Sequence, residues 1–277
     1  MTEPRERSSG RSFVAGITLL AVVSLGTLSG PWIAPHDALE TNIERRLEPP
    51  SWNFPFGTDR LGRCQLSRTL VGTRTSLGLA LLTSLIVTAI ALLVGAVGAF
   101  GGRWADGVVS RLINVFISFP SLVLALALVG VMGPSSTAVV AAIAWTWWPA
   151  EARIARSLLH TARHRDFVDA AILAGVHPAR ILYRHVWPQI GPAFAVRISL
   201  EIGSIIIALS TLSFLGLGLQ PPHPEWGVML NEARPFVATA PHLLLGPGLA
   251  LILSVLAFNL LAEGLRDRLD ARQAHEW

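Results

Sequence analysis

Long apolar stretches constrain this chain more than any other feature of its sequence. A helix crosses the hydrocarbon core of a bilayer with about 20 residues. Of the 277 residues, 52% are hydrophobic and 14% are charged, which is too apolar for an ordinary soluble domain. We therefore predict an all-α, polytopic membrane protein. Its six transmembrane helices are expected at roughly 13–33, 77–100, 112–132, 137–150 (continuing as helix to about 159), 193–219 and 243–265.

Arginine is distributed unevenly along the chain and predicts how it sits in the membrane. All 22 basic residues are arginines, and with six alternating spans 15 of them fall on one side and seven on the other. Because basic residues are in excess on the cytoplasmic side of membrane proteins, we expect both termini in the cytoplasm. The net charge of +4 then reflects topology, and no nucleic-acid partner is expected. The expected organisation is a cytoplasmic tail at 1–12 and one transmembrane domain at 13–277, with external loops at 34–76 and 220–242 and a cytoplasmic loop at 151–192.

The middle of the cytoplasmic loop has the pattern of a helix-turn-helix. Val168, Ala171 and Ile172 are spaced for one face of a short helix. Gly175 can supply the left-handed residue that ends this helix. Pro178 suits the first position of a second helix, where its missing N–H is not needed. We predict a small, rigid and exposed knob that fits a partner's socket.

Five positions of this loop match a known motif: Asp169, Ala170, Ala171, Gly175 and Pro188. They resemble the EAA loop of the permeases of binding-protein-dependent ABC importers, which is that family's contact with its ATPase subunits. The sequence departs from the family pattern with Asp169 in place of Glu, His185 in place of an aliphatic residue and Trp187 in place of Leu. The resemblance implies that the five positions, together with His185, are the residues that couple this chain to ATPases.

Four further segments match a second set of signatures, at 56–68, 213–218, 222–229 and 259–270. They resemble, in the same order, segments of the dipeptide, oligopeptide and nickel branch of that family, and within it the C-type subunit. The departures are Cys64 and Glu263, each in place of Asp. Many peptide-type members also have an acidic residue four positions before the second segment, where this chain has Leu209. That difference leaves the cargo open.

The resemblance implies a fold, a location and a set of partners. The fold would be that of a type I ABC importer permease in the plasma (inner) membrane of a bacterium. The partners would be a homologous second permease in a heterodimer, two ATPase domains on separate chains or fused in one, an extracytoplasmic solute-binding protein, and membrane lipid. The ATPase subunits would bind ATP and Mg, and this chain would hold no cofactor. The sequence has no P-loop, which phosphate binding of that kind needs, so we expect a non-catalytic subunit.

Several classes of function compete with this interpretation. For the cargo, dipeptides and oligopeptides are the first expectation, and nickel or a haem- or glutathione-like compound is the alternative. A secondary transporter should show inverted repeats and paired charges near the midplane, and neither is evident in the sequence. A membrane-embedded hydrolase would need a motif such as HExxH or GxSxG, and the sequence contains neither.

Seven external residues of the matched segments are candidates for docking a partner or forming the channel mouth: Gly57, Asp59, Arg63, Gly216, Gly218, Glu225 and Trp226. Asp59 and Arg63 could instead form a local salt-bridged cap. Glycine lets helices approach closely or the chain turn, so Gly216 and Gly218 could also mark a simple helix end. Trp226 could anchor at the membrane interface, and Glu225 could meet a docking protein.

Three polar residues within the predicted spans, Asn114, Arg197 and Glu201, are candidates for an intramembrane role. Arg197 and Glu201 are four residues apart and share a helix face, so we expect an ion pair, the alternative being a functional intramembrane charge. Asn114, with Ser118, could line a polar pathway or form hydrogen bonds between helices. The eight histidines lie outside the apolar stretches and Cys64 is the single cysteine, so we expect no metal site and no intrachain disulfide.

Overall fold

The computed structural model describes residues 3–274, with side chains described for 13–269 except those at 27, 28, 31, 169, 172, 178, 179 and 185. Over these residues the chain is helical, and its one isolated β-bridge joins Thr58 to Cys64. The helices are α1 (Glu3–Ile33), α2 (Gln65–Phe100), α3 (Gly102–Ile117), α4 (Ser121–Met132), α5 (Ser136–Arg163), α6 (Asp166–Leu173), α7 (Pro178–Ile181), α8 (Trp187–Phe214), α9 (Trp226–Ala233) and α10 (Leu245–Ala274). Short turns of helix are η1 (Ile43–Arg45), η2 (Leu182–Val186), η3 (Arg234–Phe236) and η4 (Pro241–Leu244).

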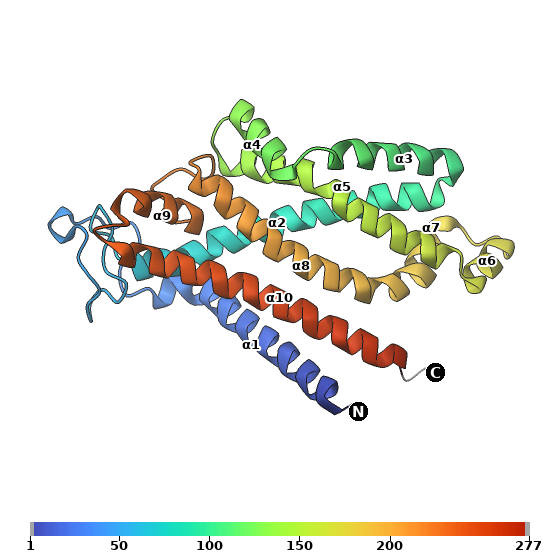
Figure 1. The fold of residues 1–277 in the computed structure, drawn as a ribbon, viewed down its shortest axis with the longest axis horizontal. Coiled ribbons are helices and arrows are strands. Elements are labelled where there is room, and N and C mark those ends of the chain that lie inside the picture. Colours follow the sequence, from blue (N-terminus) through green and yellow to red (C-terminus); the bar gives the residue numbers. More distant parts are fainter. Residues whose placement is uncertain (1–2, 275–277) are drawn as a thin grey trace.

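The long helices run between two distinct ends of the molecule (Figure 1). One end carries α9 and the connection between α1 and α2, and we call it the external end because the sequence predicts that its loops are external. The other end carries α6, α7 and the ends of the chain. This arrangement places the loop that resembles the coupling motif far from the external signature segments.

By length and apolar composition, the described helices supply three membrane spans, or four if a bent helix pair counts as one. Within the described residues, α2, α8 and the segment Pro241–Leu269 are long and apolar enough to cross a membrane. The bent pair α3 and α4 could supply a fourth span, and α1 contains a shorter apolar stretch, Phe13–Gly26. The chain is an all-α, multi-pass membrane protein, and the count of six spans stays a prediction.

Small residues let the helices pack closely. Ala80, Val87 and Ala91 on α2 are fully buried in the main core, which α5 and α8 complete. A Cβ placed on Gly95 would lie 3.0 Å from Cβ of Ala155 on α5. A Cβ on Gly264 of α10 would lie 2.4 Å from Cα of Phe13 on α1, and this spacing requires glycine. Such close approach is the usual basis of helix association in lipid.

The second long helix begins earlier than the sequence predicted. We expected an external loop up to residue 76, but α2 begins at Gln65. The first three turns look polar in sequence because they contain residues such as Ser67, Arg68 and Thr73. All three are buried by other parts of the external end, so polarity there reflects internal contacts and not exposure to water.

The predicted third span is broken in two. α3 and α4 meet at an angle of 80° with the break at residues 118–120. Pro120 explains the break because proline has no N–H to donate and disfavours helical geometry in the residue before it. The expectation of one continuous helix over 112–132 is therefore wrong.

The other helices agree better with expectation. α5 continues unbroken to Arg163, as the extension of the fourth stretch predicted. α8 begins at Trp187, inside the segment expected to be loop, and ends at Phe214 instead of continuing to 219. The early end follows from Gly216, whose φ of +83° turns the chain out of the helix. α10 begins within two residues of its expected start.

Candidate functional site

The loop between α5 and α8 forms the helix hairpin that its sequence predicted. α6 ends in a Schellman motif, in which the N–H of Val176 donates to the carbonyl of Ala171 at 3.1 Å. Gly175 provides the left-handed residue of this motif, with φ +74°. Pro178 is the first residue of α7, as expected from its missing N–H. The prediction of two short helices with a glycine stop between them is confirmed.

The inner face of the hairpin is seated on the bundle. Val168, Ile181 and Val186 are almost completely buried in a cluster with Ala99 of α2 and Leu159 of α5. Three separate segments of the loop therefore contribute apolar side chains to one small core. This core fixes the hairpin on the ends of α2, α5 and α8, so a force on the hairpin acts on those helices.

The outer face of the hairpin presents apolar side chains to solvent. Leu173 at the end of α6 is 89% exposed and Tyr183 in η2 is 79% exposed. Arg180 and Arg184, which flank Tyr183 in sequence, are also exposed. A contiguous exposed apolar patch marks a site of contact with another protein or with a membrane. This combination of apolar and cationic side chains fits a partner surface with an apolar socket and acidic margins.

The motif residues themselves occupy different positions around this surface. The backbone of Asp169 lies in α6 and that of His185 in η2, but their side chains are outside those described. Ala170 is exposed and Ala171 is partly buried, while Pro188 is in the first turn of α8 and exposed. The sequence reasoning missed Leu173 and Tyr183, although an apolar residue just before the terminating glycine is a usable signal.

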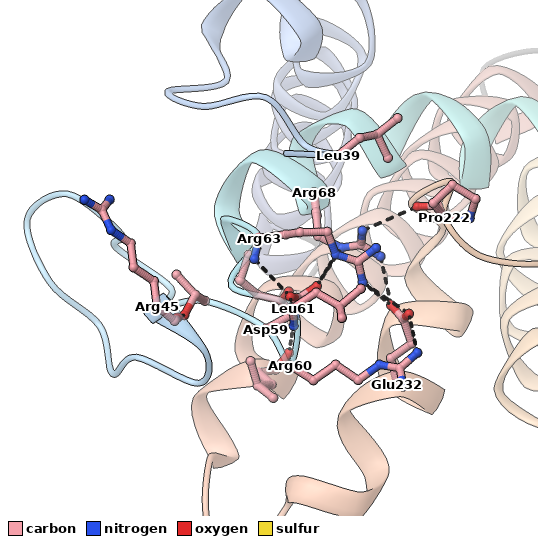
Figure 2. A network of polar contacts seen from close by, with 12 residues as sticks. Leu39, Arg45, Asp59, Arg60, Leu61, Arg63, Arg68, Pro222 and Glu232 are labelled. Atoms are coloured by element: carbon pink, nitrogen blue, oxygen red, sulfur yellow. Dashed lines mark hydrogen bonds and ion pairs between the residues drawn. The ribbon is translucent and has the colours of Figure 1, made fainter. Parts of the chain in front are cut away.

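At the opposite end, the predicted docking residues Asp59 and Arg63 lie inside a buried ion network (Figure 2). Arg63 Nε donates to Asp59 Oδ2 at 2.6 Å, and the Arg63 guanidinium also contacts Glu232 of α9 at 3.2 Å. Arg68 of α2 binds the same Glu232 carboxylate at 2.8 Å. The network therefore joins the external loop, α2 and α9. It is a salt-bridged structure, more extensive than the local cap that the sequence suggested.

Glycines shape the loop that carries this network. Gly57 and Gly62 have φ values of +71° and +73°. A Cβ on Gly62 would lie only 1.7 Å from the carbonyl oxygen of Asn42. Gly57 is similarly enclosed, because a Cβ there would lie 2.4 Å from the carbonyl oxygen of Glu48. These positions require glycine for internal geometry, and Gly57 is buried away from any docking partner.

Glu225 and Trp226 are also internal, with 2% and 1% of their surfaces exposed. Glu225 caps the N-terminus of α9 by accepting hydrogen bonds from the N–H groups of Gly227 and Val228, at 2.9 and 3.0 Å. Burial raises the pKa of the Glu225 carboxyl, and these two donors act in the opposite direction. Trp226 donates from its indole to the carbonyl of Thr69 at 3.1 Å. Their burial contradicts the hypotheses that Glu225 meets a docking protein and that Trp226 anchors at the membrane interface.

Gly216 and Gly218 form a tight turn after α8, beside an apolar groove. A Cβ on Gly218 would lie 2.0 Å from Oγ of Ser213, so the turn closes onto the end of the helix. The groove has a volume of about 590 Å³. It lies between α8 and α10 and is lined mainly by apolar side chains, with polar groups from Ser210, Thr211 and Asn259.

The predicted ion pair between Arg197 and Glu201 is wrong, because the partner of Arg197 is Glu151. Arg197 donates through both Nε and one terminal nitrogen to the carboxylate of Glu151 on α5, the Nε contact being 2.8 Å. Glu201 instead points to α2, where the hydroxyls of Ser84 and Thr88 lie 3.3 and 3.4 Å from Oε2. Spacing along one helix carries no information about a carboxylate on another helix, so the pair of Arg197 with Glu151 could not be predicted from the sequence.

The remaining polar candidates have structural partners. Asn114 on α3 accepts a hydrogen bond from Arg153 of α5 at 3.0 Å, which agrees with the helix-packing alternative. Arg156 of α5 makes a two-pronged contact with Asp106 of α3, at 2.6 and 2.7 Å. Within the described part of the chain, no three His, Cys, Asp or Glu side chains converge as metal ligands would.

Comparisons with known proteins agree with this architecture. A family model described as "Binding-protein-dependent transport system inner membrane component" matches residues 71–275. The nickel transport system permease protein NikC of Escherichia coli (strain K12) is 38% identical over 264 residues, covering 95% of each chain. The di/tripeptide transport system permease protein DppC of Pseudomonas aeruginosa (strain UCBPP-PA14) is 38% identical over 265 residues, covering 94% of this chain and 88% of the relative.

A third relative is named for a different transported compound. The glutathione transport system permease protein GsiD of Pectobacterium atrosepticum is 39% identical over 259 residues, covering 93% of this chain and 86% of the relative. The family model covers well over half of the chain, and the relatives cover nearly all of it. The chain therefore belongs to the family of inner-membrane components of binding-protein-dependent transport systems, the non-catalytic permease subunits of ABC importers.

Proposed function

We propose that this chain forms one half of the translocation pathway of an importer for dipeptides and oligopeptides, and that the α6–α7 hairpin couples it to ATPase subunits. The observation that carries the coupling role is the outer face of the hairpin. Leu173 and Tyr183 are large, apolar and exposed on a segment whose inner face is packed against three long helices. Removing such an exposed apolar side chain from water lowers the free energy of the complex with a partner.

The mechanism follows from the connection of the hairpin to α8. η2 leads directly into α8, and α8 also packs in the main core with α2 and α5. ATP-driven closure of the partner ATPases would move the hairpin, and α8 would transmit that movement toward the opposite end. Rigid rotation of packed helices is an established way to expose a pathway to one side and then the other.

The groove between α8 and α10 is the proposed share of the pathway in this chain. It combines a mostly apolar lining with hydroxyl and amide groups from Ser210, Thr211 and Asn259. Such a lining suits a cargo that passes without being held tightly, and the second permease of a heterodimer would close the open side. Gly216 and Gly218 would then lie at the mouth of the channel.

The remaining partners and the orientation complete the proposal. A solute-binding protein would deliver the cargo at the end that carries α9, and two ATPase domains, on separate or fused chains, would bind ATP and Mg at the hairpin end. The arginine excess supports placing the chain termini and the hairpin in the cytoplasm of a bacterium. This chain itself would need no cofactor.

The coupling role can be tested at Leu173 in the assembled transporter in proteoliposomes. Leu173→Asp places a charge where the proposal requires an apolar contact, and Leu173→Met is the matched control because it keeps an apolar side chain of similar volume. In the Asp variant, we expect the loaded binding protein to stimulate ATPase activity at least tenfold less than in the wild type. The Met variant should keep most of the stimulation. Normal stimulation and normal uptake by both variants would refute the role of this surface.

The cargo requires a separate measurement. Relatives named for nickel, di- or tripeptides and glutathione are 38–39% identical to this chain, so identity does not separate these cargos. Calorimetric titration of the cognate solute-binding protein with dipeptides, Ni²⁺ and glutathione would decide. Binding of a dipeptide supports the proposal, whereas binding of Ni²⁺ alone would replace it with the nickel alternative and leave the coupling role unchanged.

A further inference from the structure

Glu201 is a buried carboxyl group with no assigned role. It lies in α8, two turns beyond Pro192, and only 2% of its surface is exposed. Its Oε2 atom contacts the hydroxyls of Ser84 and Thr88, but Oε1 is buried and has no hydrogen-bond partner among the described residues. An ionised carboxylate in an apolar interior is stable only when it is paired and fully hydrogen-bonded. Glu201 satisfies neither condition as an anion.

Among the described residues, the one cation that acts on Glu201 is already engaged. The charged groups whose fields reach it are Arg197, one turn away on α8, and Glu151 on α5. Arg197 and Glu151 bind each other through two contacts, so together they carry no net charge. The α2 side of the contact contributes hydroxyls and no cation. An ionised Glu201 would therefore leave the three groups with a net charge of −1 inside the bundle.

We propose that Glu201 is a proton-binding site at the contact between α2 and α8, and that it is a neutral carboxylic acid in this packed state. The proton comes from a hydronium ion: one hydronium O–H bond breaks, an O–H bond forms at Oε2, and a water molecule is left. The acid O–H then donates to the hydroxyl oxygen of Ser84 or Thr88, either of which can accept as well as donate. Oε1 becomes an uncharged carbonyl, which is far less costly to bury than a carboxylate oxygen.

A metal cation fits this position less well than a proton. A hard cation such as Ca²⁺ takes about six to eight oxygen ligands. Around Glu201, the described contacts supply two hydroxyl oxygens besides the carboxyl group itself. A proton requires only one acceptor, and these hydroxyls provide two.

The proposal links protonation to the conformation of the permease. Any movement of α8 that separates it from α2 would expose Glu201 to water, where a glutamic acid has a pKa of about 4.3 and is therefore ionised at neutral pH. The proton is therefore bound in the packed state and released when this contact opens. Low pH stabilises the packed state, and high pH favours its opening. This inference depends on the geometry of α2, α5 and α8 and is independent of the cargo.

Infrared spectroscopy of the assembled transporter in lipid nanodiscs tests the protonation directly. The difference spectrum between the wild type and Glu201→Gln isolates this single carboxyl group. At neutral pH we expect the carbonyl stretch of a protonated carboxylic acid in the wild type, absent from the variant. Loss of a carboxylate band in its place would overturn the proposal.

Thermal unfolding of matched variants gives a second, independent test. Gln has nearly the shape of a protonated Glu, so Glu201→Gln should keep the melting temperature at neutral pH and stay stable at higher pH, where the wild type loses stability. Glu151→Gln is the control, because it strands the Arg197 cation and should lower the melting temperature clearly. If Glu201→Gln destabilises as much as Glu151→Gln, or fails to fold, Glu201 functions as an anion and the proposal is wrong.

Discussion

The two ends of this permease differ in the burial of the side chains at and beside their matched motifs. At the external end, Arg63 and Arg68 are almost completely buried and bind Asp59 and Glu232 (Figure 2). At the hairpin end, arginines are exposed, and so is the apolar side chain of Leu173. The ion network pairs Asp59, Arg63 and Glu232 within the chain, whereas Leu173 and Tyr183 leave apolar surface exposed beside the hairpin motif.

This difference changes how the family resemblance should be interpreted. The external signature residues Gly57, Asp59 and Arg63 serve the internal geometry of one loop. The hairpin motif instead has exposed neighbours, since Gly175 turns the chain two residues after the exposed Leu173 at the end of α6. A matched motif can thus mark either a buried structural centre or an exposed surface, and on the proposed function the exposed one is the docking surface.

The largest expected effect concerns the external network, through Glu232→Ala. Removing this carboxylate leaves Arg63 and Arg68 buried without their shared partner. Breaking a buried ion pair from one side costs about 3–5 kcal/mol. We expect a large fall in thermal stability, measured by unfolding of the purified chain in detergent.

The matched control for that prediction is Arg60→Ala. Arg60 contacts the same carboxylate at 3.6 Å, but its side chain is 47% exposed. Exposed ion pairs contribute about 0–1 kcal/mol, so this variant should unfold close to the wild type. Equal losses from the two substitutions would show that burial does not set the strength of this network.

A second prediction compares Gly62→Ala with Gly175→Ala, two glycines with nearly the same φ. At Gly62 the new Cβ would lie 1.7 Å from the carbonyl oxygen of Asn42, whereas nothing lies within 4 Å of a Cβ at Gly175. The left-handed conformation costs a residue with a Cβ about 1–2 kcal/mol, and overpacking adds about 1–3 kcal/mol. We expect about 2–5 kcal/mol lost at Gly62 and only about 1–2 kcal/mol at Gly175, from the same unfolding measurement. A larger loss at Gly175 would contradict the view of the external end as the more tightly constrained one.

Sequence reasoning was most successful where the structure is determined by local chemistry. The Gly175 stop, Pro178 at the start of α7 and the length of α5 all follow from backbone rules and apolar periodicity. These rules act over a few residues, so neighbours in sequence are sufficient to predict them. The all-α membrane architecture follows in the same way from the apolar stretches.

Sequence reasoning failed where distant segments meet. The partner of Arg197 is Glu151, which is 46 positions away on another helix. The polar start of α2 looked like a loop because nothing in its own sequence indicates that other segments bury it. Trp226 was likewise expected at the membrane interface, because its own sequence does not indicate that other segments bury it. In the structure, the indole of Trp226 on α9 reaches the carbonyl of Thr69 on α2.

The smallest expected effect on stability is at the hairpin surface, through Tyr183→Ser. With 79% of Tyr183 exposed, the substitution removes little buried contact, and surface changes of this kind usually stay within about 0.5 kcal/mol. The melting temperature should therefore match the wild type. Coupling should respond differently, because aromatic side chains are among the residues that contribute most at protein interfaces. Stimulated ATPase activity in proteoliposomes should fall at unchanged stability, which is the reverse of the result expected for Glu232→Ala. If Tyr183→Ser instead destabilised the fold and left the stimulation intact, the hairpin would be a structural centre like the external end, and the contrast between the two ends would not hold.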